Sequence, residues 1–167
     1  SMSARQYVMV LNVPFYRVDD NVIACESAFA THLKELLPRI ASWGGRIVIH
    51  SPQMTPQQYA NNRHHLTHID SIKDSIHYTE SISTSTSRFG FILRAPFIIW
   101  PKIWRVVKSA HVVHSSVSMD ILKSFTIISL IFAVIQGKKS IFVMDIDYRN
   151  SAEMLYKTKK LSLKSYL

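Results

Sequence analysis

The sequence predicts an α/β fold with a doubly wound, mostly parallel β-sheet and helices on both faces of that sheet. Short runs of consecutive apolar residues are typical of strands that are buried on both faces. Between these runs lie longer segments whose apolar residues recur at three- and four-residue spacing, as in helices that cover a sheet. The two kinds of segment alternate along the chain, and its 167 residues suit a single domain.

The amino-terminal part of the chain contains two predicted strands and one long helix. Residues 7–13 are a continuous apolar run, which Pro14 ends ahead of a polar loop at 16–21. Apolar residues at helical spacing predict a helix over 24–42. Two glycines stop this helix, and the second strand follows at 46–50.

The remaining elements are shorter, and two prolines interrupt them. Pro96 and Pro101 are expected to break the segment in which they lie. Strands and helices in this alternating order predict one Rossmann-like domain over 1–167. In chain order, we expect a short helix at 56–62, a strand at 76–78, an exposed loop at 81–87, a helix from about residue 98, a strand at 112–113, a buried helix at 119–135, a strand at 141–144 and a helix capped by Asn150 or Ser151.

Composition and charge limit the function classes. The formal net charge of +9 favours an anionic partner, although ordinary solvated lysines and arginines explain the same number. The single cysteine, Cys25, excludes an intrachain disulfide, and we expect it to be a small core residue. No GxGxxG motif follows the first strand and no P-loop is present, which counts against dinucleotide-dependent oxidoreductases and P-loop ATPases.

The amino terminus and the longest apolar stretch bear on where in the cell the protein is expected. No signal-peptide pattern is visible at the amino terminus. The longest apolar stretch, 125–135, is shorter than the about 20 residues that cross a bilayer. We therefore expect a cytoplasmic protein, with peripheral attachment to the inner face of the membrane as a further option.

Polar residues follow three of the predicted strands. The carboxyl ends of parallel strands meet at one edge of the sheet, where open α/β folds bind ligands, so we expect these residues to line one cleft. They are Asp145, Asp147 and Arg149 after the last strand, His114, Ser115 and Ser116 after the strand at 112–113, and Asn12 with the loop that holds Asp19, Asp20 and Asn21 after the first strand.

The acidic group after the last strand favours hydroxyl recognition. Asp145 and Asp147 are two residues apart, so an extended chain points both carboxylates the same way. Carboxylates accept hydrogen bonds from neighbouring hydroxyls, and Arg149 can bind a phosphate or carboxylate. The alternative is an ion pair between aspartate and arginine that only fixes the loop. His114 likewise is either a base or sugar ligand, or a partly buried histidine bonded to the backbone.

A metal site is not expected. The sequence shows no third convergent ligand at metal-site spacing beside the two aspartates. His64, His65 and His68 have plausible zinc spacing but lack companion ligands, and we interpret them as a surface loop.

Residues 88–109 combine aromatic and basic side chains. Basic amphipathic segments with tryptophan and phenylalanine suit a membrane surface, or here a surface that receives an acceptor. Trp and Phe come with aliphatic residues at helical spacing and not exposed among glycines, so we expect no nucleic-acid binding. The alternative is a core helix with a basic outer face. The residues expected on this surface are Trp100, Lys102, Trp104, Arg105 and Lys108.

Three segments resemble motifs of the amino-terminal domain of GT-B fold glycosyltransferases, in the glycosyltransferase group 1/family 4-like class. Residues 110–116 (AHVVHSS) resemble the form ADVVHxH, and residues 137–147 (GKKSIFVMDID) resemble GKPxVxxxHD. Residues 25–49 are similar to the helix and strand with the pattern HLxxLAxxLxxxGHxVxV. Ser116 replaces the second histidine of the first motif, and the glycine-rich turn after the first strand is replaced by residues 14–21.

The resemblance implies a role on the acceptor side of a sugar transfer. In that family two Rossmann-like domains face a cleft, the amino-terminal one binds a saccharide or lipid-linked acceptor, and the carboxyl-terminal one binds the nucleotide-sugar donor. The donor domain is then absent from this chain, the isolated domain binds no cofactor or metal, and alone it is inactive. His114 and the Asp145 to Arg149 edge are the residues carried over as cleft residues, and the pathway class is polysaccharide or glycolipid biosynthesis.

Two rival functions stay open. The chain can be a non-catalytic α/β binding or regulatory module with an anionic partner. The second rival is a nucleic-acid binder, which electrophoretic mobility shifts at physiological salt test. Surface made for a missing domain can also pair with a second copy, giving a homodimer of this chain.

Overall fold

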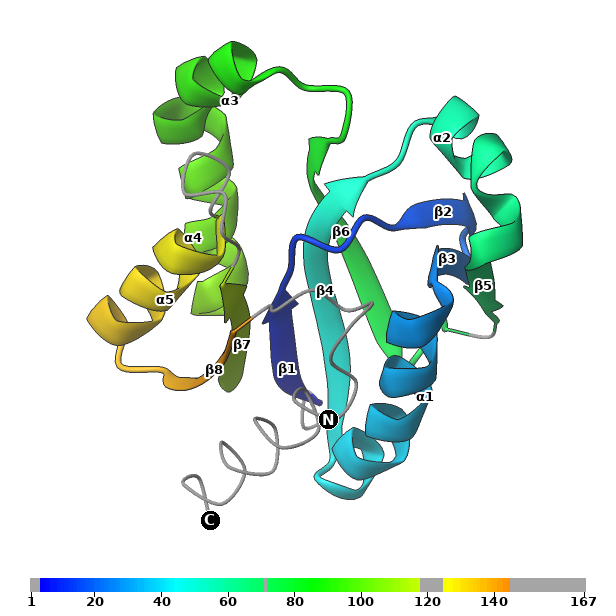
Figure 1. The fold of residues 1–167 in the computed structure, drawn as a ribbon. Coiled ribbons are helices and arrows are strands. Elements are labelled where there is room, and N and C mark those ends of the chain that lie inside the picture. The colour runs from blue at the N-terminus through cyan, green and yellow to red at the C-terminus, as the bar shows by residue number, and fades with distance from the viewer. Residues whose placement is uncertain (1–3, 71, 118–124, 145–167) are drawn as a thin grey trace.

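The structure, a computed structural model, describes residues 4–70, 72–117 and 125–144 (Figure 1). Its main sheet has five parallel strands in the order β6-β4-β1-β7-β8. The chain adds β4 and β6 on one side of β1 and then crosses to the other side for β7 and β8, so the predicted Rossmann-like, doubly wound fold is confirmed. The strands are β1 (Arg5–Val10), β4 (Gly45–Gln53), β6 (Ile76–Ser83), β7 (Val112–Val117) and β8 (Lys139–Met144).

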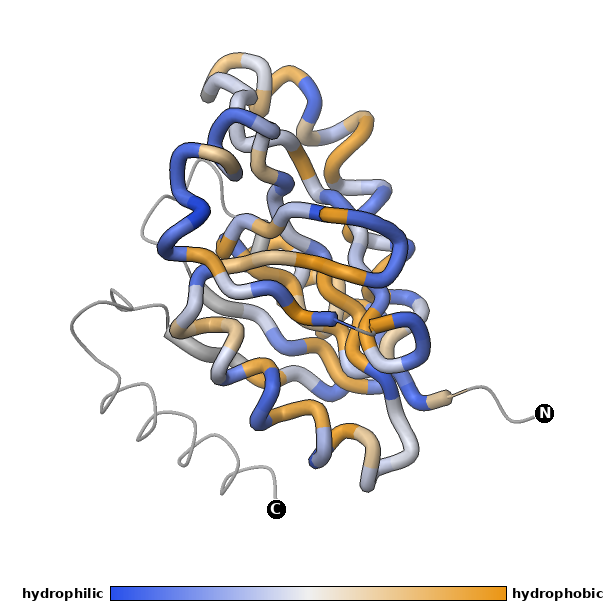
Figure 2. Tube along the Cα trace, turned by 90° about the vertical axis from the view of Figure 1, so that its right-hand side faces the viewer, coloured by the Kyte–Doolittle hydropathy of each residue, from blue (hydrophilic) through white to orange (hydrophobic). Residues whose placement is uncertain are grey.

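Alternate residues of these strands serve two hydrophobic cores on opposite faces. On β1, Tyr7 and Met9 join one core, and Val8 and Val10 join the other. Apolar residues accordingly concentrate along the strands inside the molecule (Figure 2). α1 (Ser27–Ser42) covers the first face, and the second face is covered by α3 (Arg88–Arg94), the π-helix Ala95–Ile99, α4 (Trp100–Lys108) and α5 (Phe125–Ile135) (Figure 1). Within the described ranges, no helix has the length and apolar character needed to cross a bilayer.

A small antiparallel sheet beside β6 was not predicted. It consists of β2 (Tyr16–Asp19), β3 (Val22–Glu26) and β5 (Leu66–Ile69), in the order β2-β3-β5. The loop predicted at 16–21 is therefore mostly a hairpin, and the helix predicted from Ala24 begins at Ser27. Residues 23–25 are fully buried and pair with β5, and this pairing outweighs the helical spacing that continues into them.

The prolines at 96 and 101 do not end the helix, contrary to the prediction. Helical backbone runs through residues 88–108, with a wider π-helical turn at 95–99. Proline lacks an N–H and its ring displaces the carbonyl one turn earlier, and a wider turn gives the ring the space it needs. Pro101 lies in the first turn of α4, where its missing N–H costs least.

Other predicted boundaries are close to the observed ones. α2 (Pro56–Asn61) agrees with the helix predicted at 56–62, and Thr55 and Gln58 form its capping box. β6 extends to Ser83 and β7 to Val117, so the loop predicted at 81–87 and the strand end predicted at Val113 are both placed too early. The start of the helix predicted at 119–135, and the helix predicted after Asn150, lie outside the described residues.

Candidate functional site

Polar side chains gather in the carboxyl-terminal halves of the neighbouring strands β6 and β4 and just after β1. Val10 of β1 is level with His50 of β4, and His50 is level with Thr79 of β6. Asn12 and Ser81 follow Val10 and Thr79 by two residues. Adjacent strands are about 4.8 Å apart, so three strands bring these side chains within about 10 Å across the sheet. We refer to Asn12, His50, Thr79 and Ser81 as the carboxyl-edge cluster.

Three buried atoms of the carboxyl-edge cluster have no hydrogen-bond partner: Asn12 Nδ2, His50 Nε2 and Ser81 Oγ. His50 is 1% exposed and Ser81 is 3% exposed. In the described part of the chain these are all the buried side-chain nitrogen and oxygen atoms that lack a partner, and they fall at one edge. Each such atom costs about 1–3 kcal/mol, and in native proteins ligands or ordered water satisfy them.

The hydrogen bonds of Thr79 determine which nitrogen of His50 carries the proton. The Thr79 hydroxyl donates to the carbonyl oxygen of Ile49, 3.2 Å away. Its oxygen therefore accepts from His50 Nδ1, 2.7 Å away, which must carry the hydrogen. The other nitrogen, Nε2, is then a bare acceptor. His50 thus offers a lone pair, held in place from two strands, to a ligand at the edge.

Lys102 brings a positive charge to the same place. Burial, with the charge of Lys102 as the second cause, lowers the pKa of His50 from 6.5 to about 4. The imidazole is therefore neutral near pH 7. Lys102 comes from α4 and is half-buried. Val48, two residues before His50, packs against the layer of α3 and α4.

The cluster can recognise a polar ligand but holds no strong nucleophile or acid. Asn12 offers a donor, His50 an acceptor and Ser81 a hydroxyl that can act as either. A ligand with several hydroxyl groups fits such a mixture, because every hydroxyl both donates and accepts. The ammonium of Lys102 suits a phosphate or another anionic group on the same ligand.

Ser115 of β7 is level with His50 of β4, because both pair with Val10 of β1, and His114 is one residue earlier. What distinguishes these two residues from the carboxyl-edge cluster is that their side chains have partners inside the fold. The hydroxyl of Tyr7 lies 2.8 Å from Nδ1 of His114, and burial lowers the pKa of His114 to about 4. Ser115 bonds to Ser129 of α5 over 2.7 Å. These two side chains therefore tie β7 to β1 and to α5, and their role in a cleft stays a prediction.

The turn that holds Asp19, Asp20 and Asn21 lies at the other end of the sheet. Asn21 accepts hydrogen bonds from the backbone N–H groups of Ile72 and Lys73, through its carbonyl and its side chain respectively. Ile72 and Lys73 precede β6, which is parallel to β1, so they lie at the amino ends of the strands. β2 thus carries the turn toward the amino ends of the strands, and the structure does not bring it together with the carboxyl-edge cluster.

The remaining sequence-predicted cleft residues cannot be placed. Asp145, Asp147 and Arg149 lie outside the described residues. Ser116 belongs to β7, but its side chain is outside the described set. Among the described residues, the carboxyl-edge cluster comes from β4, β6 and the residues just after β1.

The five residues predicted for a membrane or acceptor surface all lie on α4, in different settings. Arg105 and Lys108 are exposed. Trp104 packs edge-on against Phe132 of α5, with ring centroids 5.0 Å apart, and both Trp104 and Trp100 are well under half exposed. Lys102 is half-buried, and its charge helps to lower the pKa of His50.

Cys25 is a core residue, as predicted. Its side chain is fully buried, and burial raises the pKa of its thiol to about 12, so it is no nucleophile. His64 and His65 are exposed, whereas His68 belongs to β5 and bonds to the hydroxyl of Tyr59. Among the described residues no group of three His, Cys, Asp or Glu side chains could hold a metal ion.

Sequence reasoning named Asn12 but missed His50 and Ser81 as site residues. His50 closes an apolar strand just as Asp145 does, so the rule that selected the residues after the last strand would have selected it too. Ser81 gave no signal, because it starts the low-complexity run 81–87.

Comparisons with protein-family models, with curated proteins and with solved structures found no match to this chain.

Proposed function

We propose that this chain is the acceptor-binding domain of a nucleotide-sugar-dependent glycosyltransferase, which transfers a sugar to a saccharide or a lipid-linked acceptor. The donor nucleotide sugar binds to a second domain, and the two domains enclose the acceptor between them. The chain itself supplies recognition, and the transfer needs both halves.

The observation that carries the proposal is the set of unpartnered atoms in the carboxyl-edge cluster. Asn12, His50 and Ser81 present a donor, an acceptor and a hydroxyl at the edge where Rossmann-like sheets bind their ligands. Sugar hydroxyls satisfy donors and acceptors in turn. A carbohydrate would therefore remove the cost of burying these atoms unpaired.

Two further features support a sugar acceptor. Lys102 gives the site a cation for the phosphate of a lipid-linked or phosphorylated saccharide. The two segments that resemble GT-B motifs contain β7 and β8, which are neighbouring parallel strands on the other side of β1. That arrangement is the one the resemblance implies for an acceptor-side domain.

A non-catalytic binding module is the second candidate, and one observation favours it. With its pKa near 4, His50 is a weak base at neutral pH, and no carboxylate belongs to the carboxyl-edge cluster. Such a module would bind an anionic ligand through Lys102 and catalyse nothing, either alone or with a second domain.

The two candidates differ in ligand and in turnover. Saturation-transfer NMR of the chain would be recorded with neutral disaccharides, glycosyl phosphates, inorganic phosphate and sorbitol as an open-chain control. The full-length protein in which this chain occurs would then be assayed for nucleoside diphosphate release from nucleotide sugars, with and without the saccharide that binds best. The transferase predicts saccharide binding by the chain and acceptor-dependent release by the full-length protein.

Other results would reject it. Binding of inorganic phosphate as tightly as of any saccharide, with no nucleotide release, supports the module. No binding of any of these ligands removes both candidates.

A further inference from the structure

The helical segment 88–108 carries two parallel rows of residues, one buried and one exposed. One row, at every fourth residue, is buried in the second core: Phe91, Ala95, Ile99, Ile103 and Val107. The other row has almost the same spacing and is exposed: Phe89, Leu93, Phe97, Pro101, Arg105 and Lys108. We call the exposed row the outer ridge. Its first half is apolar and its second half is basic.

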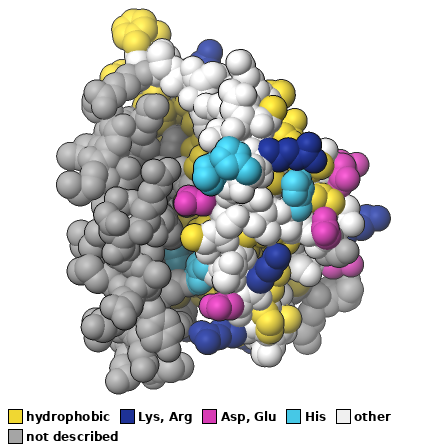
Figure 3. Space-filling view, turned by 45° about the vertical axis from the view of Figure 1, so that its right-hand side comes forward, with side chains coloured by type: hydrophobic (Ala, Val, Ile, Leu, Met, Phe, Trp, Pro, Cys, Tyr) yellow, Lys and Arg dark blue, Asp and Glu magenta, His cyan; other side chains and the backbone are white. Residues whose placement is uncertain are grey.

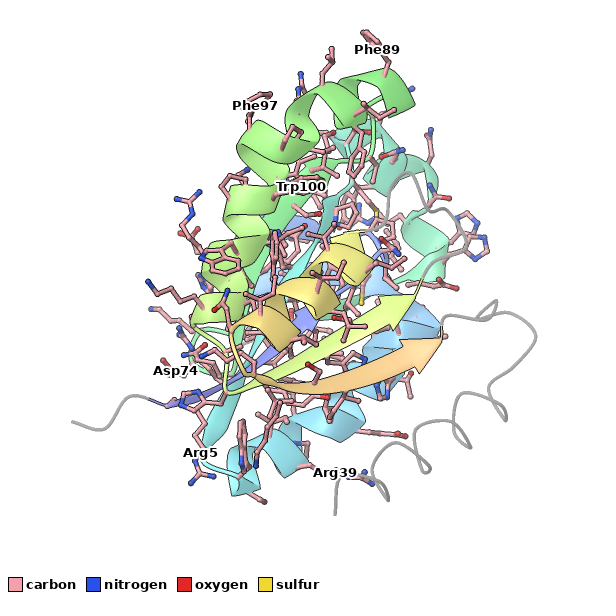
Figure 4. The ribbon with its side chains drawn as sticks, turned by 90° about the vertical axis from the view of Figure 1, so that its left-hand side faces the viewer. Arg5, Arg39, Asp74, Phe89, Phe97 and Trp100 are labelled. Atoms are coloured by element: carbon pink, nitrogen blue, oxygen red, sulfur yellow. The ribbon has the colours of Figure 1, made fainter. Side chains whose placement is uncertain are left out.

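The apolar half of the outer ridge is exposed to an unusual degree. Phe89 is 72% exposed and Phe97 is 80% exposed, and Leu93 between them is more than half exposed. Both phenylalanines stand away from the sheet on the outer side of the helix (Figure 4). Ile92 and Ile98 beside them are also about half exposed. A contiguous apolar surface of this kind marks a contact with a partner or a membrane.

The charged residues near this apolar surface indicate which kind of partner it contacts. Residues 81–119 contain no aspartate or glutamate, and Arg94, Arg105 and Lys108 are exposed along the helix. The face occupied by the small sheet and α2, in contrast, mixes acidic and basic side chains (Figure 3). Exposed basic side chains with no acidic residue along the segment, next to exposed phenylalanines, are complementary to an anionic lipid surface, where rings enter the interface and cations contact the headgroups.

We propose that the outer ridge docks this domain on an anionic lipid bilayer. Phe89, Leu93 and Phe97 enter the interfacial region, and Arg94, Arg105 and Lys108 contact the anionic headgroups. The segment is about 31 Å long, at about 1.5 Å for each of its 21 residues, so one row can lie along the membrane plane.

The apolar half of the outer ridge is the half nearer the carboxyl edge of the sheet. α3 starts five residues after the end of β6, on the side to which the strands point (Figure 1). With the ridge along the membrane plane, the carboxyl edge would lie beside the bilayer surface, near the headgroup of a lipid-linked ligand. The docking itself does not depend on sugar transfer, because a chain that binds no saccharide can still bind vesicles.

Vesicle flotation tests the proposal. The chain is mixed with vesicles of phosphatidylcholine containing 30% phosphatidylglycerol (about 0.1 M salt), and with vesicles of phosphatidylcholine alone. We expect flotation with the anionic vesicles and little with the neutral ones. Phe89→Ser with Phe97→Ser should lower the partition coefficient about 10- to 100-fold, because two exposed rings lose their burial in lipid. Arg94→Gln with Arg105→Gln and Lys108→Gln should lower it by about the same factor.

Matched control variants test whether binding depends on where the substituted residues lie and not only on the protein's total charge or apolar content. Lys34→Gln with Arg39→Gln and Lys73→Gln removes the same charge from exposed sites away from the outer ridge, and should leave flotation within about twofold of the unmodified chain. Val18→Ser removes an exposed apolar side chain from β2 and should change nothing. Circular dichroism during heating verifies that every variant is folded.

Three outcomes would overturn the proposal. The first is no flotation with anionic vesicles. The second is an equal loss in the control triple variant, which would show a diffuse charge effect. The third is a dimer in sedimentation, or a shifted RNA band at physiological salt, that Phe89→Ser with Phe97→Ser abolishes while vesicle binding persists; the ridge would then be a contact between copies or a nucleic-acid surface.

Discussion

The Nδ1 atom of His50 and the hydroxyl oxygen of Thr79 lie 2.7 Å apart across the carboxyl ends of β4 and β6. Since the Thr79 hydroxyl donates to Ile49, this contact makes Nδ1 the protonated nitrogen and leaves Nε2 as an acceptor. The acceptor is buried, has no partner among the described side chains and is held by two strands.

Removing the hydroxyl of Thr79 should release His50 from this arrangement. In Thr79→Val the Nδ1–H group loses its partner in a buried setting, so we expect about 1–3 kcal/mol of destabilisation in urea unfolding. The ring can then place its proton on either nitrogen. Long-range ¹H–¹⁵N spectra should show one tautomer in the parent chain and a mixture in Thr79→Val. Thr67→Val, a similar change on the partly buried strand β5, serves as the control for loss of a strand hydroxyl.

The unpartnered atoms should lower the stability of the ligand-free protein and raise its affinity for the ligand. In Ser81→Ala a buried hydroxyl without a partner disappears, so the free energy of unfolding should stay the same or rise by about 1 kcal/mol. Asn12→Leu should behave in the same way. Both substitutions should nevertheless lower saccharide affinity by about tenfold or more. A clear loss of stability in both variants would show that these atoms support the fold and not a ligand.

Acid should destabilise the fold through His50 and His114. Both have a folded-state pKa of about 4 against an ordinary value of 6.5, because burial disfavours the charged ring. Between these values the unfolded chain binds protons that the folded chain does not. The contribution is complete above pH 6.5 and is lost as the pH falls toward 4, by up to ~3 kcal/mol for each histidine.

Urea unfolding between pH 7 and pH 4.5 measures this effect. His50→Leu and His114→Leu should each flatten the pH dependence relative to the unmodified chain. Equal slopes in all three proteins would contradict the assignment of the two buried neutral rings.

Substitutions in the turn at Asp19 and Asp20 should not change saccharide affinity. It bonds to Ile72 and Lys73 at the amino ends of the strands, on the far side of the sheet from His50. Asp19→Asn with Asp20→Asn should therefore leave saccharide affinity within about twofold of the parent value in calorimetric titration. A loss as large as that of Asn12→Leu would place the turn in the binding site after all.

The main sheet was predictable because its strands are buried on both faces and appear as apolar runs such as 7–13 and 46–50. The small sheet was not, because residues 22–26 have no alternation and their strand state comes from pairing with β5, more than 40 positions later. The prediction that the prolines break the helix failed for a related reason. Packing of Phe91, Ile99 and Ile103 on the sheet stabilises the helix through a wider turn at Pro96.

The sequence predicted at which edge of the sheet the candidate site lies, but not most of the residues that form it. The rule that ligands bind at the carboxyl edge of the sheet led to Asn12, yet the side chains of His114 and Ser115 bond to Tyr7 and Ser129 inside the fold. His50 and Ser81 become site residues only through the absence of partners around them, and that is a property of the packed structure.

The most direct test of the proposed acceptor site is the ¹⁵N resonance of His50 Nε2 during a saccharide titration. We predict that an acceptor saccharide moves this resonance in proportion to the bound fraction, while the nitrogens of His114 stay in place and Ser81→Ala weakens the response. If the chain becomes saturated with saccharide while His50 Nε2 does not move, or if no saccharide binds at all, the carboxyl-edge cluster is not an acceptor site.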